Sequence, residues 1–600
     1  MTQLRLALAQ INPVIGDFAG NIERIVHSVR DAREAGAQLI AVGEMALTGY
    51  PVEDLVLRES FIAASQSAFV DLRHRLSAEG LDDIAIVVGT LDADGSVRPQ
   101  ATGPRGLVGA RNAAVMLHGG RVIAVHNKHH LPNHGVFDED RHFVPGNEIS
   151  VVTLRDPDGN ASRDIRTSMV VCADLWYDSG PIAKCADENV DLLICINASP
   201  HETGKDLARL TVCRRVARRT GAIVAYVNLV GGQDELVFDG SSLVVHPDGR
   251  VLAHAPSFDE SLLVVDLEIA QEGILPNVTG RTPLTEQAVR EPIRAAHADL
   301  RLPRLLINSP VPRTSVRREL SAEQQTWQTL QLGLADYVRK NGFHSVVLGL
   351  SGGIDSSVCA ALACDALGAE NVYGVSLPSE FSSQHSCDDA TDLVARTGMP
   401  HRVIPIDPMM KTFHDELPLT GLAAQNLQAR IRAVLLMGIS NSEGHLLLCT
   451  GNKSEIAVGY STMYGDAVGG FAPVKDIYKT DLWQLAQWRN EFAMLHGKQP
   501  PIPENSIAKP PSAELSLDQV DAGSLPPYEL LDAILQLYID VDWGCEEIIT
   551  AGYDADVVAR VASMVNAAEH KRRQAPLGPK IGMKAFGRDR RLPITHCFAQ

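Results

Sequence analysis

Short apolar runs rich in valine and isoleucine alternate with helical stretches along most of this chain. Such an alternation of buried strands and helices favours an α/β fold. The first series of expected strands lies at residues 4–9, 39–42, 84–88, 122–125, 169–171, 192–196, 223–227 and 242–245. The second series follows a helix that starts at Glu323, and its expected strands lie at residues 346–348, 372–375, 402–406 and 446–449.

A stretch with a different pattern separates the two series. Around residues 276–318 the chain is rich in proline, arginine and alanine and has no clear strand, as in Leu302-Pro-Arg and Pro310-Val-Pro-Arg. Breaks of this kind are typical of linkers. A chain of 600 residues is also long enough for more than one domain. We therefore expect an N-terminal domain at 1–275, a linker at 276–320 and a C-terminal domain at 321–600.

The composition argues against several classes of protein. The chain is 45% hydrophobic and 21% charged, as is usual for a globular protein, and its net charge of −19 argues against general affinity for nucleic acid. Its ten cysteines include no CxxC motif, which fits reduced thiols in the cytosol. The N-terminus lacks a signal-peptide pattern, and no uncharged apolar stretch is long enough to span a bilayer. We expect a cytoplasmic enzyme without a membrane partner.

A glycine-rich loop joins an expected strand to a helix expected over residues 354–367. Its sequence is Ser351-Gly-Gly-Ile-Asp-Ser-Ser. Small residues let the backbone bend tightly there, so that free main-chain N–H groups face an anion at the helix N-terminus. A glycine-rich turn of any doubly wound sheet is the alternative, but the full motif favours a phosphate site. It lacks the Gly-Lys-Ser/Thr of a Walker A loop and resembles the loop of the N-type ATP pyrophosphatases, which cleave ATP to AMP and pyrophosphate.

Two carboxylates near this loop are candidate magnesium ligands. Asp355 lies just past the tight turn, and Glu455 lies in Thr450-Gly-Asn-Lys-Ser-Glu, just after the expected strand 446–449. Carboxylate oxygens suit Mg²⁺, and α/β sheets place ligands at the carboxyl ends of their strands. The plain alternative is that both residues begin helices, where the helix dipole favours negative charge.

Three residues of the first part suggest a thiol amide hydrolase. Glu44, Lys128 and Cys172 each stand at the carboxyl end of an expected strand, and neighbouring parallel strands would bring them together. A cysteine attacks an amide as thiolate, a carboxylate takes its proton, and an ammonium group stabilises the oxyanion. A cysteine at the end of a buried strand is more often part of the core. Because all three residues follow expected strands, however, we favour a catalytic site.

The motifs around these residues carry a family resemblance. Four of them are similar to the nitrilase-type glutaminase domain: Glu44-Met-Ala-Leu-Thr-Gly-Tyr-Pro, Lys128-His-His-Leu-Pro-Asn-His-Gly, Cys172-Ala-Asp-Leu-Trp and Asn197-Ala-Ser-Pro. With Thr450-Gly-Asn-Lys-Ser-Glu, Tyr464-Gly-Asp and Lys571-Arg-Arg-Gln-Ala-Pro, nearly the whole chain resembles the bacterial glutamine-dependent NAD synthetases. The resemblance implies a nitrilase-like α/β sandwich followed by a doubly wound, Rossmann-like ATP pyrophosphatase domain.

The resemblance also implies roles for individual residues. Glu44 would be the general base, Lys128 the cation that stabilises the oxyanion, and Cys172 the nucleophile that forms a γ-glutamyl thioester. Glutamine would be bound by His134, Ser199 and Lys205. ATP would be bound by Gly349, Leu350, Ser351, Gly352, Gly353, Ile354, Asp355, Ser356 and Thr450, with Mg²⁺ on Asp355 and Glu455. Deamido-NAD would be bound by Asn426, Arg430, Glu455, Asp466, Lys479 and Lys571, although Lys479 and Lys571 would equally suit a solvated surface.

Three positions depart from the family pattern. Ala173 stands where the family commonly has glutamate, and because the triad itself is intact we expect an effect on local packing or orientation. His134 replaces a tyrosine that is expected to touch glutamine, so that the affinity or selectivity for glutamine would change. Gln425 replaces a glutamate and removes one negative charge near the second site.

The implied reaction is the amidation of deamido-NAD. ATP adenylates the nicotinate carboxylate with release of pyrophosphate, and ammonia derived from glutamine then displaces AMP to give NAD. The family also implies a homo-oligomer. Other adenylating enzymes share the loop, but an asparagine synthetase would need an N-terminal cysteine, and a GMP synthetase would carry a Cys-His glutaminase. A tRNA-modifying pyrophosphatase would have a basic surface, against the net charge of −19. Loss of a candidate catalytic or metal-binding residue would have favoured a degenerate regulator, but all five are present: Glu44, Lys128, Cys172, Asp355 and Glu455.

Overall fold

The structure is a computed structural model that describes residues 2–93, 109–156, 164–269, 293–303, 320–512, 514–516, 521 and 524–595. The chain divides into two compact units. The first comprises Met1–Gly231 and Phe238–Glu319, and the second comprises Gly232–Val237 and Leu320–Gln600. Among the described residues, no helix is both long and apolar enough to cross a membrane.

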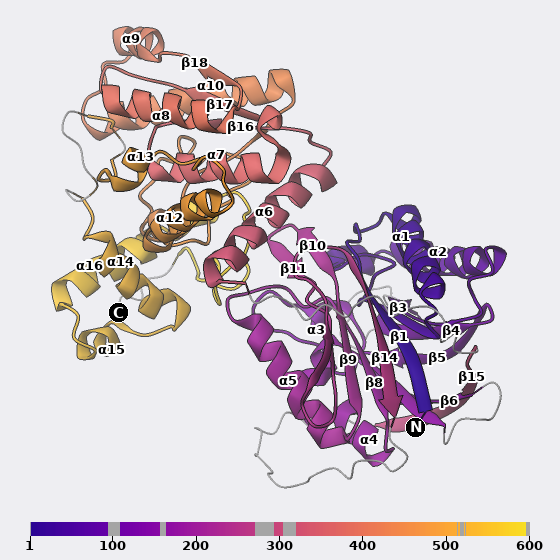
Figure 1. The fold of residues 1–600 in the computed structure, drawn as a ribbon. Helices are drawn as coiled ribbons and strands as arrows, with labels where there is room; N and C mark the ends of the chain where they lie inside the picture. The colour runs from indigo at the N-terminus through magenta and orange to yellow at the C-terminus, as the bar shows by residue number, and fades with distance from the viewer. Residues whose placement is uncertain are drawn as a thin grey trace. The chain divides into compact units, whose positions relative to one another are not determined.

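The first unit is built on two β-sheets (Figure 1). The six-stranded sheet has the order β14 (Ser261–Ile269), β1 (Thr2–Gln10), β2 (Leu39–Val42), β3 (Ala85–Asp92), β4 (Arg111–His118) and β5 (Arg121–Asn127). The seven-stranded sheet has the order β13 (Val251–His254), β12 (Leu243–Val245), β9 (Ile223–Asn228), β8 (Leu192–Asn197), β7 (Ile165–Val171), β6 (Glu148–Arg155) and β15 (Arg294–Arg301). A separate hairpin is formed by β10 (Val230–Gln233) and β11 (Leu236–Asp239), of which Gly232–Val237 belong to the second unit.

Alternating apolar side chains explain why the two sheets pack against each other. In β1, Leu6 and Leu8 share one face, and they belong to the same core cluster as Met169 and Val171 of β7. Because successive side chains of a strand point to opposite faces, Val170 lies on the other side of its sheet and packs with helices. Both faces of the seven-stranded sheet are therefore buried around β7.

Helices cover the outer faces of both sheets, which gives an α-β-β-α sandwich. α1 and α2 contact the six-stranded sheet, and α4 and α5 contact the seven-stranded sheet (Figure 1). The helices of this unit are α1 (Phe18–Glu34), α2 (Glu59–Ala78), α3 (Glu139–His142), α4 (Pro181–Asp187) and α5 (Lys205–Thr220), with 3-10 turns η1 (Glu53–Leu57) and η2 (Cys172–Trp176).

The strands that the sequence predicts in this unit are all confirmed, with ends that differ by a few residues. The pattern misses β4, β6, β10, β11, β13, β14 and β15. β15 lies within 276–320, so the expectation of no strand there is wrong, because this strand pairs in parallel with β6 along eight residues although its own faces are largely exposed. Most of 276–320 lies outside the described residues, and the domain limits stay a prediction.

The second unit has a four-stranded parallel sheet. Its order is β18 (His401–Val403), β17 (Val372–Ser376), β16 (Val346–Gly349) and β19 (Leu446–Leu447). Val346 and Leu348 pack with α6 and α7 on one face, whereas Val347 packs with residues of α10 on the other. The fold is therefore doubly wound. The chain continues from β16 to β17 on one side and reaches β19 on the other, so the switch point lies between β16 and β19.

The remaining helices surround this sheet and form a second core at the C-terminal end of the unit. They are α6 (Ala322–Lys340), α7 (Ile354–Leu367), η3 (Ala369–Asn371), α8 (Gln384–Thr397), α9 (Asp407–Glu416), α10 (Leu422–Glu443), α11 (Lys453–Val458), α12 (Lys479–Leu495), α13 (Glu504–Ala508), α14 (Tyr528–Leu535), the π-helical η5 (Gln536–Asp540), α15 (Cys545–Thr550), α16 (Ala555–Ala567) and α17 (Glu569–Arg572). α7 has the bounds that the sequence predicts, whereas the strand expected at 402–406 starts and ends earlier, as β18.

Candidate functional site

The three candidate catalytic residues of the first unit come from two different sheets. Glu44 follows β2 and Lys128 follows β5, whereas Cys172 follows β7 of the other sheet. The expectation that neighbouring parallel strands bring them together is therefore wrong, since β3 and β4 also separate β2 from β5. The strand ends meet because the sheets pack face to face. A main-chain hydrogen bond of 3.3 Å from Glu44 to Asn197, at the end of β8, joins the two sheets there.

A buried ion-pair network holds Glu44 and Lys128. The Lys128 ammonium donates to Glu44 Oε1 and to Glu139 Oε1, both at 2.8 Å. The Glu44 carboxylate also accepts hydrogen bonds from Asn112 Nδ2 at 2.6 Å and from the Ala198 N–H at 2.8 Å. Buried charges are stable only when they are paired in this way. Burial by itself would lower the pKa of Lys128, but the charges of Glu139 and Glu44 outweigh it and raise that pKa, so the ammonium form persists.

Cys172 begins the turn η2 in an unusual backbone conformation. Its φ angle is 43°, a value that residues other than glycine rarely adopt and that is found preferentially at functional sites. Burial and the negative charge of Glu44 raise the pKa of the thiol, and the positive charge of Lys128 only partly opposes them. The resting thiol is therefore protonated and needs a base, and Glu44 is also its hydrogen-bond partner.

Glu139 is a member of this network that the sequence does not reveal. It is 3% exposed, and its Oε1 also accepts a hydrogen bond from the Tyr50 hydroxyl at 2.8 Å. Burial raises the pKa of Glu139 to about 7, although the charge of Lys128 opposes the shift. A carboxyl group with such a pKa exchanges protons readily near neutral pH. In the sequence Glu139 lies between Asp138 and Asp140, which look equally suited to solvent.

Replacing Glu139 with glutamine should lower the turnover of glutamine by about 100-fold, because the Lys128 ammonium that stabilises the oxyanion loses one of the two carboxylates that keep it charged. Activity with ammonium should not change. The measurement is the steady-state rate with each nitrogen source, and the matched control is Glu59→Gln, which replaces an exposed glutamate of α2. Native glutamine turnover in Glu139→Gln would show that this carboxyl group has no part in the reaction.

Two of the three expected glutamine-binding residues lie next to segments that contact or carry the triad. Ser199 is 4% exposed and follows Ala198, which contacts Glu44. The Lys205 ammonium lies 5.0 Å from the ring centroid of Trp176, which ends the turn that Cys172 begins. His134 is exposed and its ring packs edge-on against Phe137. Within the described part of the chain, no hydrogen bond joins the His134 side chain to the other two.

The glycine-rich loop of the second unit lies between β16 and α7. Gly352 has a φ of 76°, and a Cβ atom there would lie 2.1 Å from the carbonyl oxygen of Ser386, so only glycine fits. The N–H of Gly353 donates to Ser351 Oγ at 3.2 Å, and the N–H of Ser351 donates to Ser356 Oγ at 3.4 Å. The expectation of free N–H groups is therefore wrong for these two, because loop hydroxyls occupy them; a phosphate would have to displace those hydroxyls.

The other residues expected to bind ATP lie at the same edge of the sheet. Gly349 ends β16, and Thr450 follows β19, which pairs with β16. The side chains of Leu350 and Ile354, however, belong to the hydrophobic core. Only their main-chain atoms are therefore suited to contact a nucleotide.

Asp355 and Glu455 converge on one buried ammonium group. The Lys479 ammonium donates to Asp355 Oδ2 at 2.5 Å and to Glu455 Oε1 at 3.3 Å, and Asn452 Nδ2 donates to Asp355 Oδ1 at 2.7 Å. Lys479 is 1% exposed, so it is not a solvated surface cation. Burial, together with the charge of Asp355, raises the pKa of Glu455 to about 8, while Lys479 opposes the shift. The two carboxylates thus need a cation between them.

The other four residues expected to bind deamido-NAD contact one loop around Thr462. Its hydroxyl donates to Asn426 Oδ1 at 2.8 Å, and its N–H donates to Asp466 Oδ1 at 2.7 Å. Arg430 donates to a main-chain carbonyl of this loop at 3.3 Å, and the Lys571 ammonium donates to two others at 2.7 Å. Lys571 is partly buried, and this burial lowers its pKa. The structure therefore gathers these four residues at one place.

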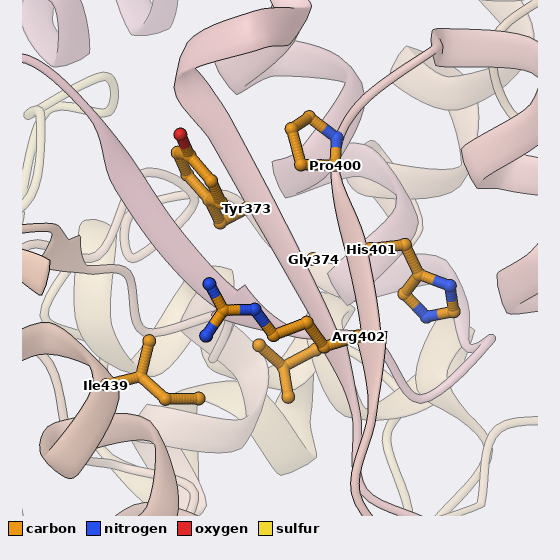
Figure 2. Close-up of a pocket in the computed structure, with 7 residues that line it drawn as sticks. Tyr373, Gly374, Pro400, His401, Arg402 and Ile439 are labelled. Atoms are coloured by element: carbon orange, nitrogen blue, oxygen red, sulfur yellow. The ribbon is translucent and has the colours of Figure 1, made fainter.

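A pocket beside β17 and β18 involves other residues (Figure 2). It is lined by Tyr373, Gly374, Val375, Pro400, His401, Arg402 and Ile439. None of them is expected to bind ATP or deamido-NAD. Arg402 is paired with Glu443 at 2.5 Å. We therefore do not assign this pocket to either site.

Comparisons with known proteins agree with two sites of different chemistry. A family model described as carbon-nitrogen hydrolase matches residues 5–274, and one described as NAD synthase matches residues 326–575. A relative from Thermotoga maritima, named glutamine-dependent NAD(+) synthetase, is 40% identical over 100% of both chains. One of the same name from Aquifex aeolicus is 40% identical over 99% of this chain and 100% of its own. The chain belongs to the glutamine-dependent NAD(+) synthetases.

A solved glutamine-dependent NAD(+) synthetase supports the same assignment. The structure from Acinetobacter baumannii, in complex with adenosine diphosphate, is 35% identical to this chain, with a TM-score of 0.70 over 99% of this chain and 98% of that one. As a glutamine-dependent NAD(+) synthetase, the chain is a ligase that amidates its substrate with nitrogen from glutamine. Both parts of the predicted fold, a nitrilase-like unit and a synthetase unit, are confirmed.

Proposed function

We propose that Glu44, Lys128 and Cys172 hydrolyse glutamine in the first unit. Glu44 takes the thiol proton, the thiolate attacks the side-chain amide, and the Lys128 ammonium stabilises the oxyanion. The leaving ammonia receives a proton from the Glu44 carboxyl group, and the γ-glutamyl thioester is then hydrolysed by water that Glu44 activates. Glu139 keeps Lys128 charged. Ser199, Lys205 and His134 bind glutamine.

In the second unit, we propose that ATP adenylates the nicotinate carboxylate of deamido-NAD. Main-chain groups from Gly349 to Ser356 and Thr450 hold the phosphates, and the Lys479 ammonium neutralises charge on the reacting groups. Ammonia attacks the mixed anhydride carbon, the bond to AMP breaks, and NAD results. The residues around Thr462, namely Asn426, Arg430, Asp466 and Lys571, bind deamido-NAD with Glu455. The adenosine diphosphate bound by the Acinetobacter baumannii relative supports a nucleotide site.

The carboxylates of Asp355 and Glu455 fit a magnesium ion. Both already point at one cation, and their hard oxygens are the ligands that Mg²⁺ prefers. Among the described residues, no group of three or more His, Cys, Asp or Glu side chains gathers as a metal site. A magnesium ion that arrives with ATP needs only one or two protein carboxylates, because phosphate oxygens and water supply the rest. When bound, it would offset the negative charge of the departing pyrophosphate.

One observation carries the proposal: a buried Glu-Lys-Cys site and a pyrophosphatase-type loop lie on the same chain. The test is product analysis of the native protein with deamido-NAD, ATP and Mg²⁺, given either glutamine or ammonium. With either nitrogen source, we expect one AMP and one pyrophosphate to form for each NAD. Release of ADP and phosphate would exclude adenylation, and absence of NAD with either source would exclude the substrate.

We also propose that the chain works in the cytoplasm as a homo-oligomer. Its second unit exposes apolar side chains on β18, on α9 and α10, which pack against each other, and at Leu417, which directly follows α9. They are Val403, Phe413, Leu417, Leu422 and Val434, each at least 50% exposed. Exposed apolar residues concentrated on neighbouring elements are typical of protein interfaces.

Replacing Val434 with aspartate should therefore lower the molecular mass in solution to that of a smaller assembly, because a charge would be buried without a partner. Light scattering after gel filtration measures this mass. The matched control is Leu495→Asp on α12, which replaces an even more exposed residue. An unchanged mass in Val434→Asp would remove this face from the interface.

A further inference from the structure

A fully buried aspartate holds the segment that carries Lys128. Asp174 Oδ1 accepts hydrogen bonds from the main-chain N–H groups of His129, at 3.1 Å, and His130, at 2.8 Å. Its Oδ2 accepts one from His126 Nε2 at 2.9 Å. These three donors flank Lys128 on both sides along the chain. The carboxylate therefore fixes the backbone from which the lysine extends.

The same carboxylate holds the segment that carries Cys172. Asp174 lies two residues after Cys172 in the turn η2, and its Oδ2 also accepts the N–H of Val171 at 3.2 Å. This bond spans the cysteine, whose φ of 43° needs support from its surroundings. One side chain thus joins the end of β5 in one sheet to the end of β7 in the other.

We propose that Asp174 is a positioning residue of glutamine hydrolysis, which sets the distance between the Lys128 ammonium and the Cys172 thiol. This proposal rests on the roles proposed above for those two residues. The lysine must lie near the oxyanion that forms when the thiolate attacks, and the two groups come from different sheets. A shift of about 1 Å between reacting groups lowers a rate about 100-fold.

The four donors explain why a carboxylate is needed at this position. Each carboxylate oxygen of Asp174 accepts two of these four hydrogen bonds. An asparagine has only one acceptor oxygen, so its NH₂ group would face N–H donors in place of the other oxygen. Burial alone would raise the pKa of Asp174, but the hydrogen bond and charge of His126 outweigh it and lower that pKa. The second ring nitrogen of His126 lies 3.2 Å from the Glu148 carbonyl oxygen, so its ring is held at both ends.

The first test replaces Asp174 with asparagine in the full chain. We expect kcat with glutamine to fall by about 10- to 100-fold, with little change in KM for glutamine. The rate at which iodoacetamide alkylates Cys172 should change as well. NAD synthesis from ammonium should stay native, because it does not use this site. The matched control is Asp191→Asn, since Asp191 accepts the Arg166 N–H at 2.9 Å at the opposite end of β7.

A second pair of variants keeps Asp174 in place, in case its replacement prevents folding. His126→Leu removes one of the four donors, and His126→Gln retains a side-chain donor. The proposal expects glutamine-dependent kcat to fall several-fold, on the order of 3- to 10-fold, in His126→Leu, and to recover in His126→Gln. Synthesis from ammonium should be native in both.

Native glutamine kcat and native alkylation in both Asp174→Asn and His126→Leu would overturn the proposal. So would a parallel loss of ammonium-dependent synthesis in folded His126→Leu, because that pattern indicates a purely structural role. A different result is expected if Cys172 is not the nucleophile that we propose. In that case alkylation of Cys172 in the native chain would leave the use of glutamine intact.

Discussion

Replacing Cys172 with alanine is expected to abolish NAD synthesis from glutamine and to leave synthesis from ammonium intact. In the proposed mechanism the Cys172 thiol is the only group of the triad that bonds covalently to the substrate, and loss of a nucleophile lowers turnover by about 1,000-fold or more. The second unit has its own core and its own sheet, so we expect its reaction not to need the thiol. Coupled measurement of NAD and glutamate formation checks both halves of this expectation.

The control for this variant is Cys213→Ala, which removes a fully buried thiol from α5 in the same unit. It should keep both activities, apart from a modest loss of stability. If Cys172→Ala still used glutamine, the nucleophile would be another residue. If it lost synthesis from ammonium as well, the two sites would not be chemically separate.

Replacing Asp355 with asparagine is expected to lower NAD synthesis from both nitrogen sources by about 100-fold or more. The variant removes a negative charge that the adenylation step needs, and adenylation precedes the attack of ammonia from either source. Asp355 contacts Lys479 at 2.5 Å and shares that ammonium with Glu455. Without it, the pair that would hold magnesium is reduced to one carboxylate. The measurement is the rate of pyrophosphate release with glutamine and with ammonium.

Asp388→Asn is the matched control for this second prediction, because Asp388 is an exposed aspartate on α8 of the same unit. It should be fully active. Native synthesis from ammonium in Asp355→Asn would remove Asp355 from the adenylating site. If Asp355→Asn lost only the use of glutamine, the substitution would act on the first unit. That result would disagree with the position of Asp355 beside Lys479 in the second unit.

Local sequence signals were sufficient for much of the fold and for the loops that carry chemistry. The helix expected at 354–367 coincides with α7, because Gly353 and Gly368 delimit it and small residues precede it. Glu44, Lys128 and Cys172 do follow the expected strands. Such signals depend on a few neighbouring residues, and a chain pattern reports them well.

Pairing between distant segments could not be predicted in the same way. The pattern does not show that β7 lies in a different sheet from β2 and β5, or that β15 pairs with β6. It also does not distinguish Glu139 and Lys479 from surface charges. Both side chains are buried against residues that lie far away along the chain. Tyr50 donates a hydrogen bond to Glu139, and Lys479 donates one to Asp355.

We propose that the nitrogen released at Cys172 becomes the carboxamide nitrogen of NAD. The most direct test gives the native chain glutamine labelled with ¹⁵N in its side-chain amide, together with deamido-NAD, ATP and Mg²⁺, and follows NAD and glutamate by mass spectrometry. We predict that ¹⁵N enters NAD as glutamate forms, and that Cys172→Ala gives neither product. Glutamate formation without labelled NAD, or labelled NAD from Cys172→Ala, would contradict this account.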